Sequence, residues 1–327
     1  MRIIDVHNHF YTPGYLDALR RGESILKVTD DEAGNPVIHY PGDYNVVVPG
    51  HRDIAYRQGV LEEEGVDTQV ITFTTPGTIV EPPAVSARMA SQVNDDLARV
   101  VQERAPRFSA LATLPLNDPV ASLKELRRVV EELKLPGAML YSNVNGVALS
   151  HEQYWPLYEY AHERKIVLHI HPTAPVGVEA MTEYWMMPLV GFLMDTTLAA
   201  GMLVFSGVAE RFPNIQWVLS HLGGAVPYLA ERFDRGFHAF PDCRANVSRP
   251  PSEYLKTWNY DTVNFDVASL ELAIKFAGAD HVLAGSDYPH AIGSIPMMKK
   301  ALSAINVTDA ERAAILGGNA ARIYGLG

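Results

Sequence analysis

The chain has 327 residues, of which 47% are hydrophobic and 20% are charged, as is typical of a soluble globular protein with a large core. Its 27 Lys and Arg residues against 38 acidic residues give a formal net charge of -11. This balance opposes nucleic-acid binding, because a phosphate backbone requires a concentrated positive surface. The single cysteine, Cys243, excludes an internal disulfide and a thiolate metal cage, and it favours a reducing, cytoplasmic compartment.

Hydrophobic runs long enough to enter a membrane are not evident. The N-terminal apolar run meets a polar residue at Asp5, which makes it too short for the hydrophobic region of a signal peptide. The longest apolar stretch, from Met186 to Val208, is interrupted by polar residues at 195–197. We interpret it as a buried helix and expect no membrane partner.

Short apolar or β-branched runs recur along the chain, and helical spacing of apolar residues follows each run. The predicted strands are Ile3 to Val6, Gln69 to Phe73, Phe108 to Leu111, Gly137 to Tyr141, Ile166 to His171, Gln216 to Ser220, Thr262 to Phe265 and His281 to Ala284. Strands that are apolar on both faces and alternate with helices are typical of a parallel sheet. Eight such units predict an α/β fold closed into a (β/α)8 TIM barrel, with an open doubly wound sheet as the alternative.

Two stretches interrupt this alternation. Residues 11–53, after the first strand, are rich in Gly, Pro and charged residues and are much longer than a usual βα loop. Residues 239–259 contain three prolines. We interpret the first stretch as an insertion at the C-terminal face of the barrel and the second as a lid or an interface loop, within one domain over residues 1–327.

Polar residues close four of the predicted strands, where a parallel barrel collects its catalytic groups. The first strand ends in His7 and His9, the fifth in His171, the sixth in His221 and the eighth in Asp287. Strand alternation places His7 and His9 on one side of the chain, so both imidazoles can reach one ion. Four histidines and one carboxylate suit Zn, Mn, Fe or Co.

Five motifs in fixed order carry a family resemblance across the whole chain: DVHNHF, HIHP, SHLGGAVPYLAERF, GSDYPH and GGNAARIYGL. Together they resemble the amidohydrolase superfamily, and within it the branch of aminocarboxymuconate semialdehyde decarboxylase and related aromatic acid decarboxylases. The resemblance implies a metal-dependent barrel of amidohydrolase type.

By this resemblance, His7, His9, His171 and Asp287 are the implied metal ligands. His221 resembles the catalytic histidine beside a metal-bound water, within reach of being a ligand too, and Asp287 would also orient that water. Binuclear members carry a carbamylated lysine on the fourth strand, where this chain has none. The implied cofactor is therefore one divalent transition metal, with Zn as first choice and Mn, Fe or Co as alternatives.

The resemblance also matches Arg57 and Arg232 to arginines that bind a substrate carboxylate. By this resemblance Arg232 would reach the site from a neighbouring subunit, which implies a homodimer. The alternative for both arginines is a solvent-exposed helix residue paired with a glutamate. Tyr11 and Trp185 are candidates for lining a pocket for a flat substrate, or for packing only.

The remaining histidines are assigned to other places. His169 shares a strand face with His171 but lies deeper, so we expect it to support the ligands rather than bind the ion. His290 either supports the site or is exposed, and His51 is predicted to be solvent-exposed.

The leading functional hypothesis is a metal-dependent decarboxylase of a small aromatic or muconate-semialdehyde-like carboxylic acid. The alternatives are a hydrolase of a lactone, amide or ester on the same scaffold and a non-catalytic metal-binding sensor.

Overall fold

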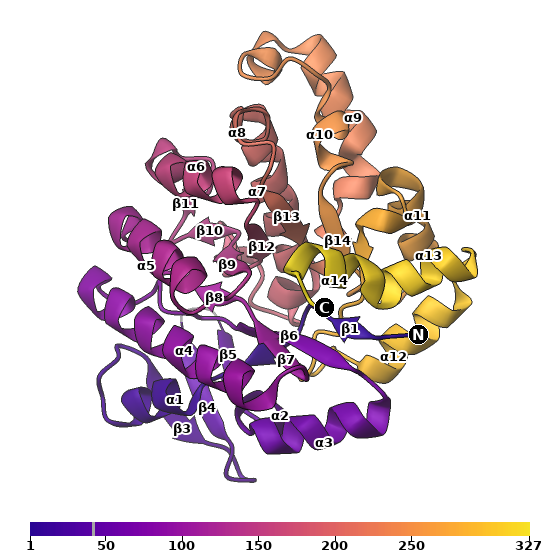
Figure 1. Cartoon of the computed structure of the whole chain (residues 1–327). Helices are drawn as coiled ribbons and strands as arrows, with labels where there is room; N and C mark the ends of the chain where they lie inside the picture. The colour runs from indigo at the N-terminus through magenta and orange to yellow at the C-terminus, as the bar shows by residue number, and fades with distance from the viewer. Residues whose placement is uncertain (41–42) are drawn as a thin grey trace.

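The computed structural model describes residues 1–40 and 43–327 and shows parallel strands surrounded by helices (Figure 1). The parallel strands are β1 (Ile4–Asp5), β2 (His9–Phe10), β6 (Thr68–Phe73), β7 (Phe108–Ala110), β8 (Ala112–Thr113), β9 (Gly137–Tyr141), β12 (Val167–His171), β13 (Gln216–Leu219), β14 (Asn259–Asp261) and β15 (Val282–Leu283). One sheet joins β1 and β2 to β6 and then β7, and a second runs in the order β15-β14-β13-β12-β9-β8.

Backbone hydrogen bonds join the two sheets at both seams. The strands β7 and β8 are one strand interrupted at Leu111, whose N–H donates to the carbonyl of Ile71 on β6 at 3.0 Å. At the other seam, the N–H of Val6 donates to the carbonyl of Ala284 at 2.9 Å, and that of Asp287 donates to the carbonyl of His7 at 2.7 Å. The ring of strands is therefore continuous, and the predicted (β/α)8 barrel is confirmed.

Helices follow the strands and cover the outside of the barrel (Figure 1). They are α3 (Ile54–Glu64), α4 (Pro83–Arg104), α5 (Pro119–Glu131), α6 (Trp155–Arg164), α7 (Phe192–Phe205), α8 (Val208–Arg211), α9 (Val226–Ala239), α11 (Val267–Ala277), α12 (Ile295–Ala304), α13 (Asp309–Ala313) and α14 (Asn319–Tyr324). Their starts follow local chemistry: the side chain of Asp118 caps α5 by accepting the N–H of Ala121, and Thr308 with Glu311 forms a capping box on α13.

The stretch predicted as a loop insertion at residues 11–53 contains regular structure. It holds α1 (Pro13–Arg20), an antiparallel sheet of β3 (Lys27–Asp30), β4 (Pro36–Tyr40) and β5 (Asp43–Val46), and α2 (Pro49–Arg52). These elements are short, and β3 is almost wholly exposed, so their hydrophobic periodicity is too weak to read from sequence.

The second interruption, residues 239–259, contains η5 (Pro241–Arg244) and α10 (Pro251–Leu255). With the outer part of α9 it extends away from the barrel (Figure 1). The strand that follows is misplaced in the prediction, because β14 spans Asn259–Asp261 rather than Thr262 to Phe265. Because this strand contains polar residues, a search for apolar runs does not detect it.

The apolar stretch predicted as a buried helix forms η3 (Met187–Gly191) followed by α7. Met187–Phe205 is long and apolar enough to cross a membrane by length and composition alone, and half of its most apolar window is buried. The other face is exposed and apolar at Met194, Leu198 and Met202. The helix is therefore only partly a core helix.

Candidate metal centre

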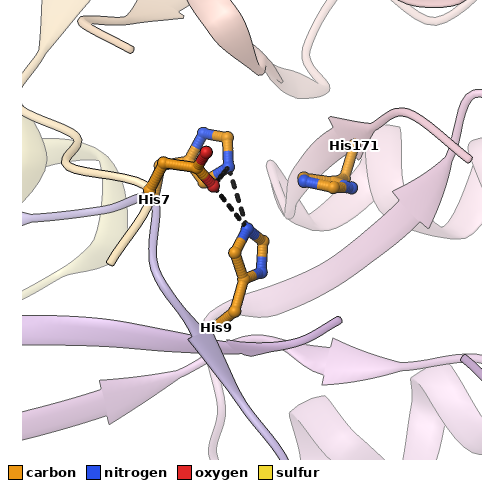
Figure 2. Close-up of side chains that lie close together, drawn as sticks. His7, His9 and His171 are labelled. Carbon is orange, nitrogen blue, oxygen red and sulfur yellow. Dashed lines mark hydrogen bonds and ion pairs between the residues drawn. The ribbon is translucent and has the colours of Figure 1, made fainter. Parts of the chain in front are cut away.

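Four buried side chains converge at the carboxyl ends of the strands. The potential ligand atoms of His7, His9, His171 and Asp287 all lie within 4.8 Å of one another. His9 Nε2 is 3.2 Å from His7 Nε2 and 3.0 Å from Asp287 Oδ1. Figure 2 shows the imidazoles of His7 and His9 pointing toward each other, with the imidazole of His171 beside them. The structure thus brings together all the predicted metal ligands.

Hydrogen bonds on the far side of two imidazoles orient them toward the centre. His7 Nδ1 contacts the carboxylate of Asp261, and His171 Nδ1 lies 2.8 Å from the carbonyl oxygen of Pro172. Each Nδ1 is therefore assigned the proton, which leaves a lone pair on Nε2. His171 Nε2 is buried and has no partner, as expected of a nitrogen whose partner is an ion. The donor set fits a divalent transition metal.

Asp261, at the end of β14, is a supporting residue that sequence reasoning missed. Besides binding His7, its carboxylate accepts the backbone N–H groups of His221 and Leu222, both at 3.1 Å. One side chain therefore positions a ligand and the predicted catalytic histidine. An acidic residue at the end of a barrel strand is a signal for a functional residue. That signal was not recognised for Asp261, because the seventh strand was predicted a few residues too late in the chain.

Burial and neighbouring charges shift the pKa values of several histidines in the centre. Burial opposes a charge on His7, but the carboxylates of Asp261 and Asp287 outweigh it and raise its pKa to about 10. Burial holds the pKa values of His9 and His171 well below their usual range. In the absence of an ion, the proton on His7 offsets part of the negative charge of the two carboxylates.

His221 stands beside this cluster in a strained backbone conformation. Its φ is 53° and that of Leu222 is 58°, in the left-handed region that costs energy for residues with side chains. The ring centroid lies 4.8 Å from that of His7 and 5.5 Å from that of His171. Burial and the charge of His7 lower the pKa of His221 to about 4, so its imidazole is neutral. It is placed to exchange a proton near the centre.

Gly224 makes the tight turn after His221 possible. A Cβ added there would lie 2.1 Å from the carbonyl oxygen of Leu193, so only glycine permits this approach to the start of α7. The turn sits where β13 ends.

A second group of ligand-type residues overlaps the first, comprising His7, His169 and Asp261. His169 Nε2 lies 3.1 Å from Ser220 Oγ and 3.9 Å from Asp261. We interpret this group as support for the first, because the His7 nitrogen on this side is already paired with Asp261. The expectation for His169 agrees with this placement.

Arg57 does not reach a substrate site. Its side chain is fully buried, and its nitrogens donate to five acceptor contacts: the side chains of Asn8 and Gln69, the carbonyl of His9 and, twice, the carbonyl of Gly50. With every guanidinium donor used by the protein, none is left for a carboxylate. The structure instead makes Arg57 a residue that positions the backbone of a metal ligand.

A cavity of about 510 Å³ opens onto the centre. It is lined by Tyr40, Tyr44, Asn45, Val46, Val48, His51, Thr75, His171, Trp185, Pro188, Leu189, Phe192, His221, Asp287, Pro289, His290, Ala291 and Ile292. Trp185 therefore lines it as predicted. Tyr11 does not, because it packs behind the wall with its hydroxyl bonded to the carbonyl of Thr75.

The structure places Arg232 outside the cavity and His51 inside its wall. Arg232 lies exposed on α9 and does not line this cavity. His51, predicted to be exposed, is instead only 2% exposed and forms part of the cavity wall, because α2 folds over the barrel mouth. His290 also lines the cavity, with its ring centroid 4.5 Å from that of His9.

The amidohydrolase family pattern matches residues 4–326, nearly the whole chain. The chain belongs to the amidohydrolase family. The resemblance seen in the motifs is thereby confirmed, and the metal centre lies where those motifs place it.

Known relatives of this amidohydrolase-family chain are decarboxylases. A 2-amino-3-carboxymuconate-6-semialdehyde decarboxylase of Dictyostelium discoideum is 34% identical over 269 residues, covering 81% of this chain and 75% of the relative. A 6-methylsalicylic acid decarboxylase of Penicillium expansum is 28% identical over 296 residues, covering 89% and 86%.

Solved structures agree with this placement. The 5-carboxyvanillate decarboxylase of Sphingomonas paucimobilis superposes with a TM-score of 0.87 at 25% identity, covering 100% of this chain and 99% of the other. A dihydroxybenzoic acid decarboxylase of Polaromonas, solved with bound manganese, gives a TM-score of 0.83 at 23% identity, covering 99% and 97%. At this lower identity the second likeness concerns the fold.

Proposed function

We propose that this protein is a metal-dependent decarboxylase that removes carbon dioxide from a small aromatic or muconate-semialdehyde-like carboxylic acid. The observation that carries the proposal is the buried cluster of His7, His9, His171 and Asp287, with neutral His221 beside it, at the end of an open cavity. Relatives with decarboxylase activity support the choice of reaction.

A divalent ion held by these four residues would supply positive charge that binds and polarises the substrate carboxylate. Trp185 and Phe192 line the cavity and would hold the ring of the acid. Loss of carbon dioxide needs a proton at the ring carbon that carries the carboxylate. His221, neutral at rest, would first take up a proton from solvent and then pass it to this carbon; the electrons of the broken C–C bond would restore the ring as carbon dioxide leaves, so that one proton is consumed per turnover.

The ion is proposed to be Zn, with Mn, Fe or Co as alternatives that suit the same ligands. Three neutral imidazoles and one carboxylate suit all four, and manganese in a structural neighbour supports a divalent ion generally. Elemental analysis of protein purified without added metal would identify the native ion.

A homodimer is proposed on two features of the surface. Arg232 lies exposed on α9, so within one chain it does not contribute to the cavity. The exposed face of α7 is apolar at Met194, Leu198 and Met202, as in an interface between subunits. Arg232 of one subunit would then bind the substrate carboxylate in the cavity of the other subunit. We also propose a cytoplasmic location, because the chain has a single cysteine.

Complementation tests the dimer and the role of Arg232 together. Arg232→Ala and His221→Ala proteins should each be inactive, and mixing them should restore activity, because a mixed dimer contains one complete site. A mixture as inactive as its components would contradict an arginine shared between subunits.

Carbon dioxide release from a panel of acids tests the proposed reaction. The panel comprises hydroxybenzoates, aminobenzoates and muconate semialdehydes, with lactones as the comparison. We expect release from at least one acid by the metal-loaded protein. Lactone opening without any carbon dioxide release would instead identify a hydrolase.

A further inference from the structure

The turn that carries His221 has a positive φ at four consecutive residues. The values are 53° at His221, 58° at Leu222, 73° at Gly223 and 60° at Gly224. The two glycines adopt such angles at little cost, whereas His221 and Leu222 do not. A backbone of this kind persists only where surrounding groups hold it in place. The position of the His221 imidazole therefore depends on the contacts that hold this turn.

The backbone N–H groups of the turn show which contacts these are. Those of its first two residues donate to the carboxylate of Asp261. Those of its two glycines donate to the carbonyls of residues 220 and 221, at 3.0 Å and 2.9 Å, within the turn itself. The next N–H, of Ala225, donates to the hydroxyl of Thr197 at 2.8 Å. Asp261 thus holds the start of the turn from outside, and Thr197 holds its end.

Thr197 is a buried residue of α7, and its hydroxyl is fixed in orientation. It donates to the carbonyl of Leu193, four residues earlier in the helix, at 2.7 Å. Its proton is therefore engaged, and the oxygen faces Ala225 as an acceptor. The helix and the turn touch at this point, because a Cβ added at Gly224 would lie 2.6 Å from the hydroxyl oxygen.

Thr197 and Asp261 differ in what else they contact. The carboxylate of Asp261 also bonds to the imidazole of His7, so its loss would disturb a proposed metal ligand as well as the turn. The two hydrogen bonds of Thr197 go to Leu193 and Ala225, neither of which is a proposed ligand. A change at Thr197 can therefore move His221 while the ligand set stays in place.

We propose that Thr197 is a positioning residue for His221: its hydroxyl holds the end of the turn so that the imidazole stands where it can pass a proton to the substrate. The inference rests on the proposed function for the role of His221 as proton donor. It assigns part of the control of proton transfer to α7, an outer helix of the barrel, whose first residue, Phe192, also lines the cavity.

Isosteric substitution tests this role. Thr197→Val removes the hydroxyl and keeps the branched shape. We expect kcat to fall about 30-fold, because proton transfer is sensitive to displacements of about 1 Å, with KM within about twofold and metal content unchanged. Thr197→Ser keeps the hydroxyl and should retain most of kcat. Thr196→Val is the matched control, since Thr196 is the adjacent buried threonine and its hydroxyl has no hydrogen-bond partner.

A double-mutant cycle separates positioning from general support of the fold. In a His221→Ala background there is no imidazole to position, so Thr197→Val should lower the residual kcat less than about twofold. An equal fall of kcat in both backgrounds would overturn the proposal. A rise in KM with unchanged kcat would also overturn it, because Thr197 would then support the cavity wall.

Amide hydrogen exchange tests the contact apart from the reaction. By NMR on the metal-free protein, the N–H of Ala225 should exchange about tenfold faster in Thr197→Val than in wild type and should be unchanged in Thr196→Val. Unchanged exchange in Thr197→Val, or loss of the fold in both Thr197→Val and Thr197→Ala, would overturn the proposal. Absence of carbon dioxide release from every acid would count against the proposed function, and the exchange rates would still decide whether Thr197 holds the turn.

Discussion

The metal centre and the outer wall of the cavity are built in different ways. The centre takes side chains from strand ends of the barrel, and groups such as Asp261 and the carbonyl of Pro172 orient its imidazoles from behind. The outer wall comes from β5, α2, η3 and the segment 289–292, and it is mostly apolar. The barrel thus fixes the chemistry, while the inserted elements adapt the same centre to a substrate.

Removal of His221, beside the metal centre, should have the largest effect on activity. His221→Ala should lower kcat about 1,000-fold, because a proton-transfer group is lost, while metal content stays near the wild-type value. Steady-state kinetics and elemental analysis on one preparation measure both quantities. His238→Ala, on the exposed part of α9, serves as the control. Loss of the ion from His221→Ala would reassign this residue as a ligand.

Support behind the ligands is tested by Asp261→Asn. Without the full carboxylate charge, His7 is oriented less firmly toward the ion, and metal affinity should fall about 10- to 100-fold. Competition with a chelator measures this. Asp266→Asn, which changes an exposed helix cap five residues on, should leave affinity unchanged. Equal affinities in wild type and Asp261→Asn would show that the carboxylate does not tune the centre.

The outer wall should affect binding rather than chemistry. Trp185→Ala removes an aromatic side chain that lines the cavity, so KM should rise about tenfold while kcat changes little and metal content stays constant. Its neighbour Tyr184, 82% exposed and outside the lining, provides the matched Tyr184→Ala control. A fall in kcat with constant KM would place Trp185 in the chemical step.

Proton release gives the smallest expected signal. The pKa of His7 is raised to about 10 without an ion, so at pH 7 the residue carries a proton that ion binding must displace. About one proton should therefore leave per ion bound, and affinity should rise with pH up to about 10. Calorimetry in buffers of different ionisation enthalpy counts the protons. Binding without proton release would show that His7 is already neutral.

The sequence allowed prediction of the barrel and of the ligand cluster for a simple reason. His7, His9, His171 and Asp287 follow strongly apolar strands, and parallel strands bring such ends together. Asp261 was missed because β14 is short and polar, so the strand that positions it lacks an apolar run.

Other residues required tertiary information. His51 becomes buried only because α2 folds over the barrel mouth, and local sequence carries no sign of that packing. Arg57 is committed to acceptors up to 49 positions away in the chain, such as Asn8, which no helical pattern reveals. Tyr11 packs behind the cavity wall for the same kind of reason.

The central claim is that one ion at the His7, His9, His171 and Asp287 site supports decarboxylation. Its most direct test is to strip the protein of metal and titrate a divalent ion back while following carbon dioxide release from a carboxyl-labelled hydroxybenzoate. The account predicts no release without the ion and a linear rise that levels off at about one ion per chain. Full release by the stripped protein, or a requirement for two ions, would contradict it.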